Sequence, residues 1–272
     1  MSKRSGIARL VRWRASRDKQ DMVMTALKRI GKVLLDFVLP SRCAACGEIV
    51  ADVHSFCAEC WTRIDFLGSA GCQTCGTPLE ATDAGTCAAC LARPPRIART
   101  RAAVAYDDLT RGLAIRLKYG RKVALARTMA RFMAPLVAVD DDGQATTIDP
   151  VLLPVPLHRS RLWQRGFNQS ALIARELSRR TGLNCNPFLL RRKRRTPPLK
   201  GMGQSQRRRT VTGAFEVPER AKIRGRTIIL IDDVMTTGST AEACARTLQR
   251  AGAARVELIC WARVVRPAHL ER

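Results

Sequence analysis

TIILIDDVMTTGST, residues 227–240, is the stretch of this 272-residue chain that indicates its fold. Its apolar run, Ile228 to Ile231, presents aliphatic side chains on both alternating faces, which is typical of a parallel strand covered on both sides. Asp232 and Asp233 follow directly, and ligands of open α/β sheets bind at the carboxyl ends of the strands. The stretch therefore predicts a central strand of an α/β sheet that ends at a binding site.

A small-residue loop comes next and leads into a helical pattern over residues 241–251. It offers hydroxyls, backbone N–H groups and one residue free to adopt positive φ: Thr236, Thr237, Gly238, Ser239 and Thr240. Unpaired N–H groups at a helix N-terminus favour anions, so we expect a phosphate there. Two carboxylates beside a phosphate must face another group, and ribose hydroxyls or a shared Mg²⁺ would suit them. The alternative is a plain connection in which the acids serve as turn and N-cap residues.

Composition indicates a folded chain with a strong positive charge. Hydrophobic residues make up 46% of the sequence and the formal net charge is +25. Charge of this size favours polyanionic partners, and nucleic acid, a membrane surface and pyrophosphate-bearing small molecules all qualify. No apolar run approaches the roughly 18 to 20 residues that span a bilayer, and the N-terminal sequence lacks the apolar core of a secretory signal. We expect no transmembrane segment and a cytoplasmic location.

The first forty residues divide into two segments. Residues 1–25 are basic and predict a disordered tail, with a nucleic-acid-binding arm as the alternative. Residues 26–40 show apolar residues at helical spacing and end at Pro40. They predict an amphipathic helix docked on the protein, with a membrane-surface helix as the alternative.

Four C-x-x-C pairs define a cysteine-rich module at residues 41–93. Each pair places two thiolates on one turn, and two pairs complete a tetrahedral zinc site. The spacing favours sequential pairing and one or two structural Zn²⁺ ions, with cross-braced pairing as the alternative. Disulfides are disfavoured by the metal spacing and the missing secretion signal. The candidate ligands are Cys43, Cys46, Cys57, Cys60, Cys72, Cys75, Cys87 and Cys90.

Residues 96–266 form the expected second domain. An apolar strand at 151–157 leads into a loop carrying Arg159, Arg161 and Arg165, and a helix follows at 170–181. Guanidinium groups bind phosphate oxygens in bidentate fashion, so the loop is a candidate pyrophosphate site. Surface arginines on a turn are the alternative.

The region from Arg191 to Arg209 has nine basic residues and no acid. Two prolines and two glycines interrupt it, which predicts a mobile loop: a lid over a polyanionic substrate or a strip along a nucleic-acid backbone. A strand at 214–217 should lead back to the central strand, and a last strand at 255–264 should pack beside it.

Five segments occur here in an order that resembles the ComF family, whose members join a zinc-ribbon module to a phosphoribosyltransferase-like domain. They are the cysteine pairs, LKYGRK (117–122), PVPLHRSRLWQRGFNQ (154–169), RTPPLKGMGQSQRRRTVTGAF (195–215) and IILIDDVMTTGST (228–240). The last is also similar to the 5-phosphoribosyl-1-diphosphate (PRPP) motif of type I phosphoribosyltransferases. The resemblance implies an α/β fold of that type, with a parallel sheet flanked by helices behind a double zinc ribbon.

The resemblance also implies residue roles. Asp232 and Asp233 would be the catalytic acids that hold the ribose hydroxyls, and residues 236–240 would hold the 5-phosphate. Arg159, Arg161, Arg165 and Asn168 would lie in or beside the pyrophosphate loop, and Mg²⁺ would accompany PRPP. The family is associated with DNA uptake, which implies single-stranded DNA or DNA-processing proteins as partners.

Two functions follow. The first is PRPP binding with phosphoribosyl transfer and release of pyrophosphate, a glycosyltransferase reaction. The alternative is a non-enzymatic protein that binds nucleic acid or senses PRPP and uses the fold as a scaffold. Glutamine-dependent amide transfer is not expected, because that reaction needs an N-terminal cysteine and this sequence begins Met1-Ser2, with its first cysteine at Cys43.

Overall fold

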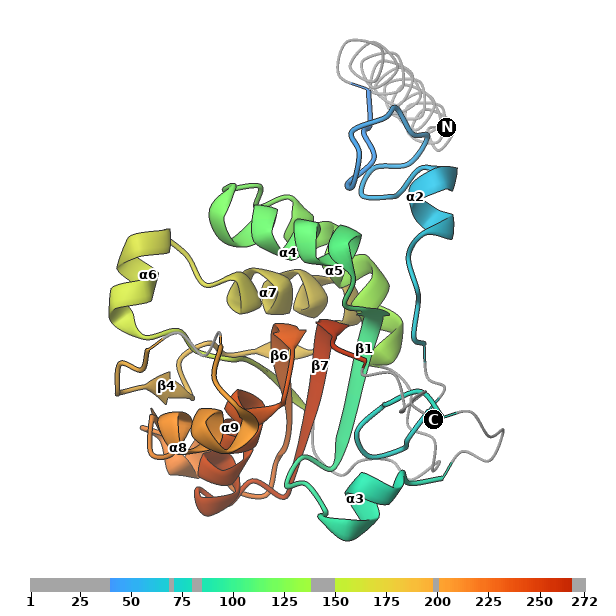
Figure 1. Ribbon diagram of the computed structural model, residues 1–272. Coiled ribbons are helices and arrows are strands. Elements are labelled where there is room, and N and C mark those ends of the chain that lie inside the picture. Colours follow the sequence, from blue (N-terminus) through green and yellow to red (C-terminus); the bar gives the residue numbers. More distant parts are fainter. Residues whose placement is uncertain (1–39, 69–70, 80–84, 138–149, 198–200, 266–272) are drawn as a thin grey trace, which may run out of the picture.

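A computed structural model describes residues 40–68, 71–79, 85–137, 150–197 and 201–265 (Figure 1). The expectations for the tail at 1–25 and the helix at 26–40 fall outside these residues, apart from Pro40. Among the helices in the described ranges, none has the length and apolar character needed to cross a membrane.

A five-stranded sheet forms the centre of the molecule. Its order is β1-β7-β6-β2-β3, and every neighbouring pair is parallel. The strands are β1 (Arg99–Ala105), β2 (Val151–Pro154), β3 (Asn184–Cys185), β6 (Thr227–Met235) and β7 (Arg255–Arg263). The expected central strand is β6, and the expected last strand is β7 beside it.

The side chains of β6 explain its central place. Ile229 and Ile231 join one buried apolar cluster, whereas Ile228 and Leu230 join another on the opposite face. Both faces of the strand are therefore covered, as the continuous apolar run predicts. β6 also continues beyond its acids to Met235, so Asp232 and Asp233 belong to the strand itself.

Helices cover both faces of the sheet (Figure 1). Leu117, Met129 and Leu177 place α4, α5 and α7 on the face of Ile229. Val211 and Leu248 place α8 and α9 on the other face, together with a two-stranded antiparallel sheet of β4 and β5. The bounds are α4 (Asp108–Tyr119), α5 (Leu125–Met133), η1 (Ala134–Leu136), α7 (Gln169–Thr181), β4 (Arg191–Arg192), α8 (Gln204–Val211), β5 (Phe215–Glu216), η2 (Arg220–Lys222) and α9 (Ser239–Arg250).

The structure adds to or differs from three local expectations. The arginine segment after β2 is a short helix, α6 (Arg159–Arg165), rather than a loop; His158 accepts a hydrogen bond at its N-terminus and Gly166, at φ 80°, ends it. Part of the basic region, expected as a loop, is also helical, because α8 begins at Gln204 and continues past Arg209 to Val211. The strand expected at 214–217 is β5, and it pairs with β4 instead of returning to the central sheet.

Segments from both cysteine modules hydrogen-bond to the outer edge of β1. Ala105 N–H donates to the Asp65 carbonyl at 2.8 Å, and Leu67 N–H donates to the Ala103 carbonyl at 3.1 Å. Farther along β1, Thr100 N–H donates to the Thr74 carbonyl at 2.7 Å. The first cysteine module, with α2 (Ala58–Thr62), therefore lies at the carboxyl end of β1. The second, with α3 (Ala88–Ala92), lies toward its amino end (Figure 1).

The first cysteine module shares a hydrophobic core with the α/β domain. The rings of Phe56, Trp61 and Phe66 lie with centroids 5.3, 5.8 and 5.5 Å from that of Phe132 on α5. Cys57 and Cys60 are buried in the same apolar cluster. This module is thus packed onto the domain beside the carboxyl edge of the sheet.

Candidate functional site

The acidic pair at the end of β6 is held by the start of α7 and the end of α4. Asp232 Oδ1 accepts hydrogen bonds from Ser170 Oγ at 3.0 Å and from Asp233 N at 2.9 Å. Asp233 is 3% exposed; its Oδ1 accepts from Gln169 Nε2 at 3.4 Å, and its Oδ2 pairs with the Lys118 ammonium. The two carboxylates are therefore fixed by different partners.

These contacts set the charges of the site. Burial and the neighbouring charge of Asp233 raise the pKa of Asp232 to about 7. Burial pulls the pKa of Lys118 down, but the carboxylates of Asp233 and Asp232 outweigh it and raise that pKa above its ordinary value. Lys118 consequently stays a cation, and a bound cation or hydroxyl donor would favour ionised Asp232.

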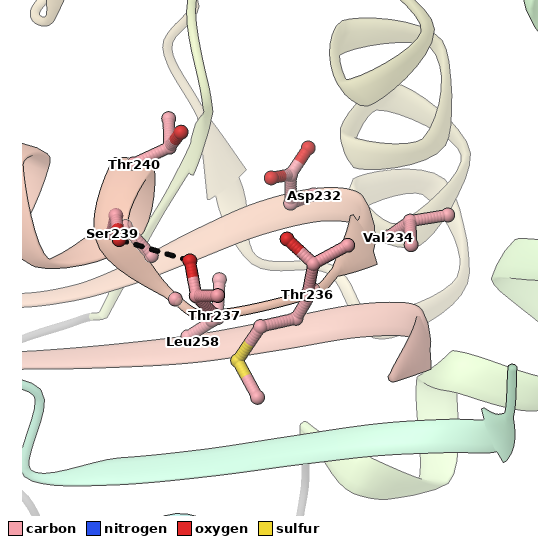
Figure 2. Close-up of a pocket in the computed structure, with 10 residues that line it drawn as sticks. Asp232, Val234, Thr236, Thr237, Ser239, Thr240 and Leu258 are labelled. Atoms are coloured by element: carbon pink, nitrogen blue, oxygen red, sulfur yellow. Dashed lines mark hydrogen bonds between the residues drawn. The ribbon is translucent and has the colours of Figure 1, made fainter. Parts of the chain in front are cut away.

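A small pocket lies between the acidic pair and the N-terminus of α9. It has a volume of about 40 Å³ and is lined by Asp232 and the loop 236–240, among others (Figure 2). Gly238 adopts φ 70°, which turns the chain into α9, and Thr237 Oγ1 lies 2.9 Å from Ser239 Oγ. Hydroxyls and the open end of a twelve-residue helix suit one small anion there.

The arginines of α6 have separate surroundings. Arg165 donates to Tyr119 Oη at 3.0 Å and to Gln169 Oε1 at 3.2 Å, so it reaches a partner of the acidic pair. Arg161 instead donates to the Thr196 carbonyl at 3.1 Å, in the basic region. Arg159 is exposed. Of the three, Arg165 is thus the one connected by hydrogen bonds to the acidic pair.

Asn168 caps α7. Its Oδ1 accepts from Ser170 N at 3.0 Å, and its Nδ2 donates to the Val155 carbonyl at 3.1 Å. Both polar ends of the side chain are therefore used within the protein. Asn168 orients Gln169 and Ser170, which in turn hold the acids.

The structure brings three further residues to the site: Lys118 and Tyr119, to which the sequence analysis gave no role, and Arg207, which it placed in the basic region. Lys118 and Tyr119 come from the LKYGRK segment, which contributed to the family resemblance alone. Arg207 on α8 donates to Thr236 Oγ1 at 2.9 Å, so the basic region reaches the loop at the end of β6. The clue available in the sequence was the placement of these residues in two of the family segments.

The eight paired cysteines form two clusters, Cys43/46/57/60 and Cys72/75/87/90, as sequential pairing predicts. Within each, the four sulfur atoms lie within 4.8 Å of one another, a separation that suits tetrahedral zinc. Burial opposes ionisation of Cys43 and Cys72, yet backbone N–H groups of the knuckles lower the pKa of both thiols to about 6. Burial raises the pKa of Cys60 and Cys90. A zinc ion would hold all four ligands of a cluster as thiolates.

Two family models match the chain. The double zinc ribbon domain matches residues 34–91, and the phosphoribosyl transferase domain matches residues 167–269. Among solved structures, a glutamine PRPP amidotransferase from B. subtilis matches at 18% identity, covering 50% of this chain and 25% of that chain with a TM-score of 0.33.

Relatives match over almost their whole length. DNA utilization protein YhgH of Escherichia coli O157:H7 is 30% identical over 228 residues, covering 84% of this chain and 99% of the relative. Competence protein F of Haemophilus influenzae is 27% identical over 219 residues, covering 80% of this chain and 94% of the relative. With a double zinc ribbon, a phosphoribosyltransferase domain and these relatives, the chain belongs to the ComF family.

Proposed function

We propose that the carboxyl edge of the sheet binds PRPP with Mg²⁺ and transfers its phosphoribosyl group to an acceptor. The observation that carries this proposal is the acidic pair beside an anion-suited pocket at the start of α9. The bond between ribose C1 and pyrophosphate breaks, a bond from C1 to the acceptor forms, and the acceptor loses a proton. Positioning and charge stabilisation supply the catalysis.

Each part of the ligand has a set of candidate partners. Residues 236–240 hold the 5-phosphate, and Asp232 and Asp233 hold the ribose hydroxyls. Arg159, Arg161 and Arg165 receive pyrophosphate, after Arg161 and Arg165 leave their present partners Thr196 and Tyr119. Asn168 positions the start of α7. Asp232 would help to hold Mg²⁺, which would supply positive charge beside the leaving pyrophosphate; carboxylate oxygens suit this ion, and the hydrogen bonds to Asp232 within the described residues all go to Oδ1.

Thermal unfolding with and without PRPP and Mg²⁺ tests this proposal. Ligand at about a hundred times its Kd stabilises by about 2.7 kcal/mol, which is a rise of roughly 5 to 10 °C in Tm for a domain of this size. Asp232→Asn with Asp233→Asn should abolish the rise. Asp108→Asn, at an exposed acid on α4, should leave it intact.

A rise that survives in the double variant, or no rise in the wild-type protein at millimolar PRPP, would contradict the proposed site. Release of pyrophosphate in the presence of candidate acceptors then separates a transferase from a protein that senses PRPP.

A nucleic-acid function is the second candidate, and the protein's charge of +25 and its relatives' names favour it. We propose that the protein binds single-stranded DNA or acts with DNA-processing proteins. Zinc-bound thiolates suit a reducing compartment, which supports a cytoplasmic location.

A further inference from the structure

A second, larger hollow lies between the first zinc ribbon and the turn that joins α4 to α5. Its volume is about 540 Å³. We call it the ribbon groove and define it by six of its lining residues: Arg42, Val53, Arg116, Arg121, Lys122 and Val123. Neither the acidic pair nor the loop 236–240 contributes to it.

The ribbon groove carries uncompensated positive charge. In the described part of the chain, no carboxylate pairs with Arg116, Arg121 or Lys122. Two nearby arginines, by contrast, do pair with carboxylates: Arg127 with Glu176 at 3.6 Å and Arg131 with Asp52 at 3.7 Å. The groove thus gathers basic side chains whose charges the protein leaves available to a polyanion.

Apolar surface accompanies this charge. Val53 is 58% exposed and Val123 is 50% exposed, so the groove has uncharged walls as well as basic ones. Tyr119 precedes the groove in sequence without lining it; it is 68% exposed, and the Arg165 guanidinium lies over its ring, 4.9 Å from the centroid. Basic side chains beside exposed aromatic and apolar surface are what single-stranded nucleic acid uses, because its phosphates need cations and its unpaired bases need surfaces to stack on.

Fewer arginine side chains of the basic region at 191–209 are free to bind a nucleic acid than its composition suggests. Arg192 is buried over the ring of Phe215, and Arg194 donates to the carbonyls of Thr210 and Thr212 at the end of α8. Arg207 is held by Thr236 and Met202. Several of its arginines therefore stabilise the fold, which favours the ribbon groove as the nucleic-acid surface.

One turn connects the groove to the candidate active site. Lys118 at the end of α4 pairs with Asp233, and Tyr119 binds Arg165. Arg121, at φ 51°, then lines the groove. A strand lying in the groove would pass beside the residues that hold the acidic pair.

We propose that the ribbon groove binds the backbone of a single-stranded nucleic acid. The inference deepens the nucleic-acid part of the proposed function and is independent of the phosphoribosyl site.

The test variant is Arg116→Gln with Arg121→Gln and Lys122→Gln. Binding of a fluorescein-labelled oligothymidylate of about 20 nucleotides, longer than one typical site of about 4 to 16, is measured by anisotropy across a salt series. The plot of log affinity against log salt has a negative slope, and each lost phosphate contact reduces its magnitude by about 0.7. In the triple variant the magnitude of the slope should therefore decrease by about 2, and the affinity at about 0.1 M salt should decrease by at least tenfold.

A matched control removes the same charge elsewhere. Arg220, Lys222 and Arg224 are exposed on and after η2, just before the amino end of β6. Their triple change to Gln should alter the affinity less than about twofold, because it removes charge without removing contacts. Zinc content, Tm and the PRPP-dependent rise in Tm should stay unchanged in the groove variant.

Three results would overturn the proposal. The groove variant could bind like wild type, the control could lose as much affinity as the groove variant, or a duplex of equal length could bind wild type as tightly as the single strand. If wild type binds no oligothymidylate but still shows the PRPP-dependent rise, the nucleic-acid function fails and the phosphoribosyl function stands.

Discussion

Lys118 is the residue that makes two adjacent carboxylates tolerable at the end of β6. Its side chain is 22% exposed and that of Asp233 is 5% exposed, so the ion pair is largely removed from water. A charge left alone in such a place costs far more than one at the surface.

Removing this cation should destabilise the protein. Lys118→Met leaves Asp233 buried without its counterion, and we expect the free energy of unfolding to fall by about 3–5 kcal/mol in urea denaturation. Adding Asp233→Asn should restore most of the loss, because the buried charge is then gone. Equal stability of wild type and Lys118→Met would show that Asp233 does not depend on Lys118.

Asp232 should make stability depend on pH. Its pKa is about 7 in the folded protein, against about 3.9 in an unfolded chain. Between these values the folded state holds a proton that the unfolded state has released, so this residue's contribution to the free energy of unfolding falls as pH rises.

The measurement compares wild type with Asp232→Asn without added Mg²⁺. The difference in unfolding free energy, wild type minus variant, should decrease from about pH 5 to about pH 7 and then level off. The subtraction cancels the titrating groups that do not interact with Asp232. A difference that stays constant across this range would contradict a raised pKa.

At the scale of elements, the first cysteine pair of each ribbon offers a matched comparison. Gly47 and Gly76 each follow a ligand cysteine and adopt φ of 88° and 68°. A Cβ on Gly47 would meet nothing within 4 Å, whereas one on Gly76 would lie 2.5 Å from the Thr100 carbonyl of β1. The turn after Cys75 in the second ribbon thus packs its backbone directly against the backbone of the edge strand β1.

Alanine at each glycine separates this packing from backbone strain. Gly47→Ala should cost about 1–2 kcal/mol for its left-handed conformation. Gly76→Ala should cost about 1–3 kcal/mol more, because it forces the knuckle away from β1. Unfolding free energies and zinc content check this, and equal losses would show that the close approach contributes nothing.

Elements were predictable from the sequence where a local pattern determines them. The apolar run of β6, the loop before α9 and the spacing of the cysteine pairs each carry their own signal. α6 and α8 do not: both are arginine-rich and lack apolar periodicity, and α8 relies on contacts from Arg194, outside the helix. The pairing of Lys118 with Asp233 joins distant segments and needed the structure.

At the scale of the whole molecule, the two ribbons are attached differently. The first contributes Phe56 and Ile64 to the apolar cluster beneath α5. The second is joined by hydrogen bonds, such as the one from Arg263 Nη2 to Thr77 Oγ1 at 2.8 Å. We therefore expect their zinc sites to matter unequally to the α/β domain.

Cysteine pairs test this difference. Metal analysis should find two zinc ions per chain, and Cys57→Ser with Cys60→Ser should lower the unfolding free energy by about 3 kcal/mol or more through lost apolar burial. Cys87→Ser with Cys90→Ser should cost less, since hydrogen bonds contribute about 0.5–1.5 kcal/mol each. Equal losses, or one zinc ion or fewer, would contradict this.

The covered edge of β1 has a consequence for self-association. An uncovered edge strand exposes a row of N–H and C=O groups that can pair with a second chain. Here Asp65 and Leu67, just after the first cysteine cluster, and Thr74, within the second, hydrogen-bond to that edge. We expect zinc loss to release these segments and uncover β1, so that zinc would protect the sheet against aggregation as well as hold the ribbons folded.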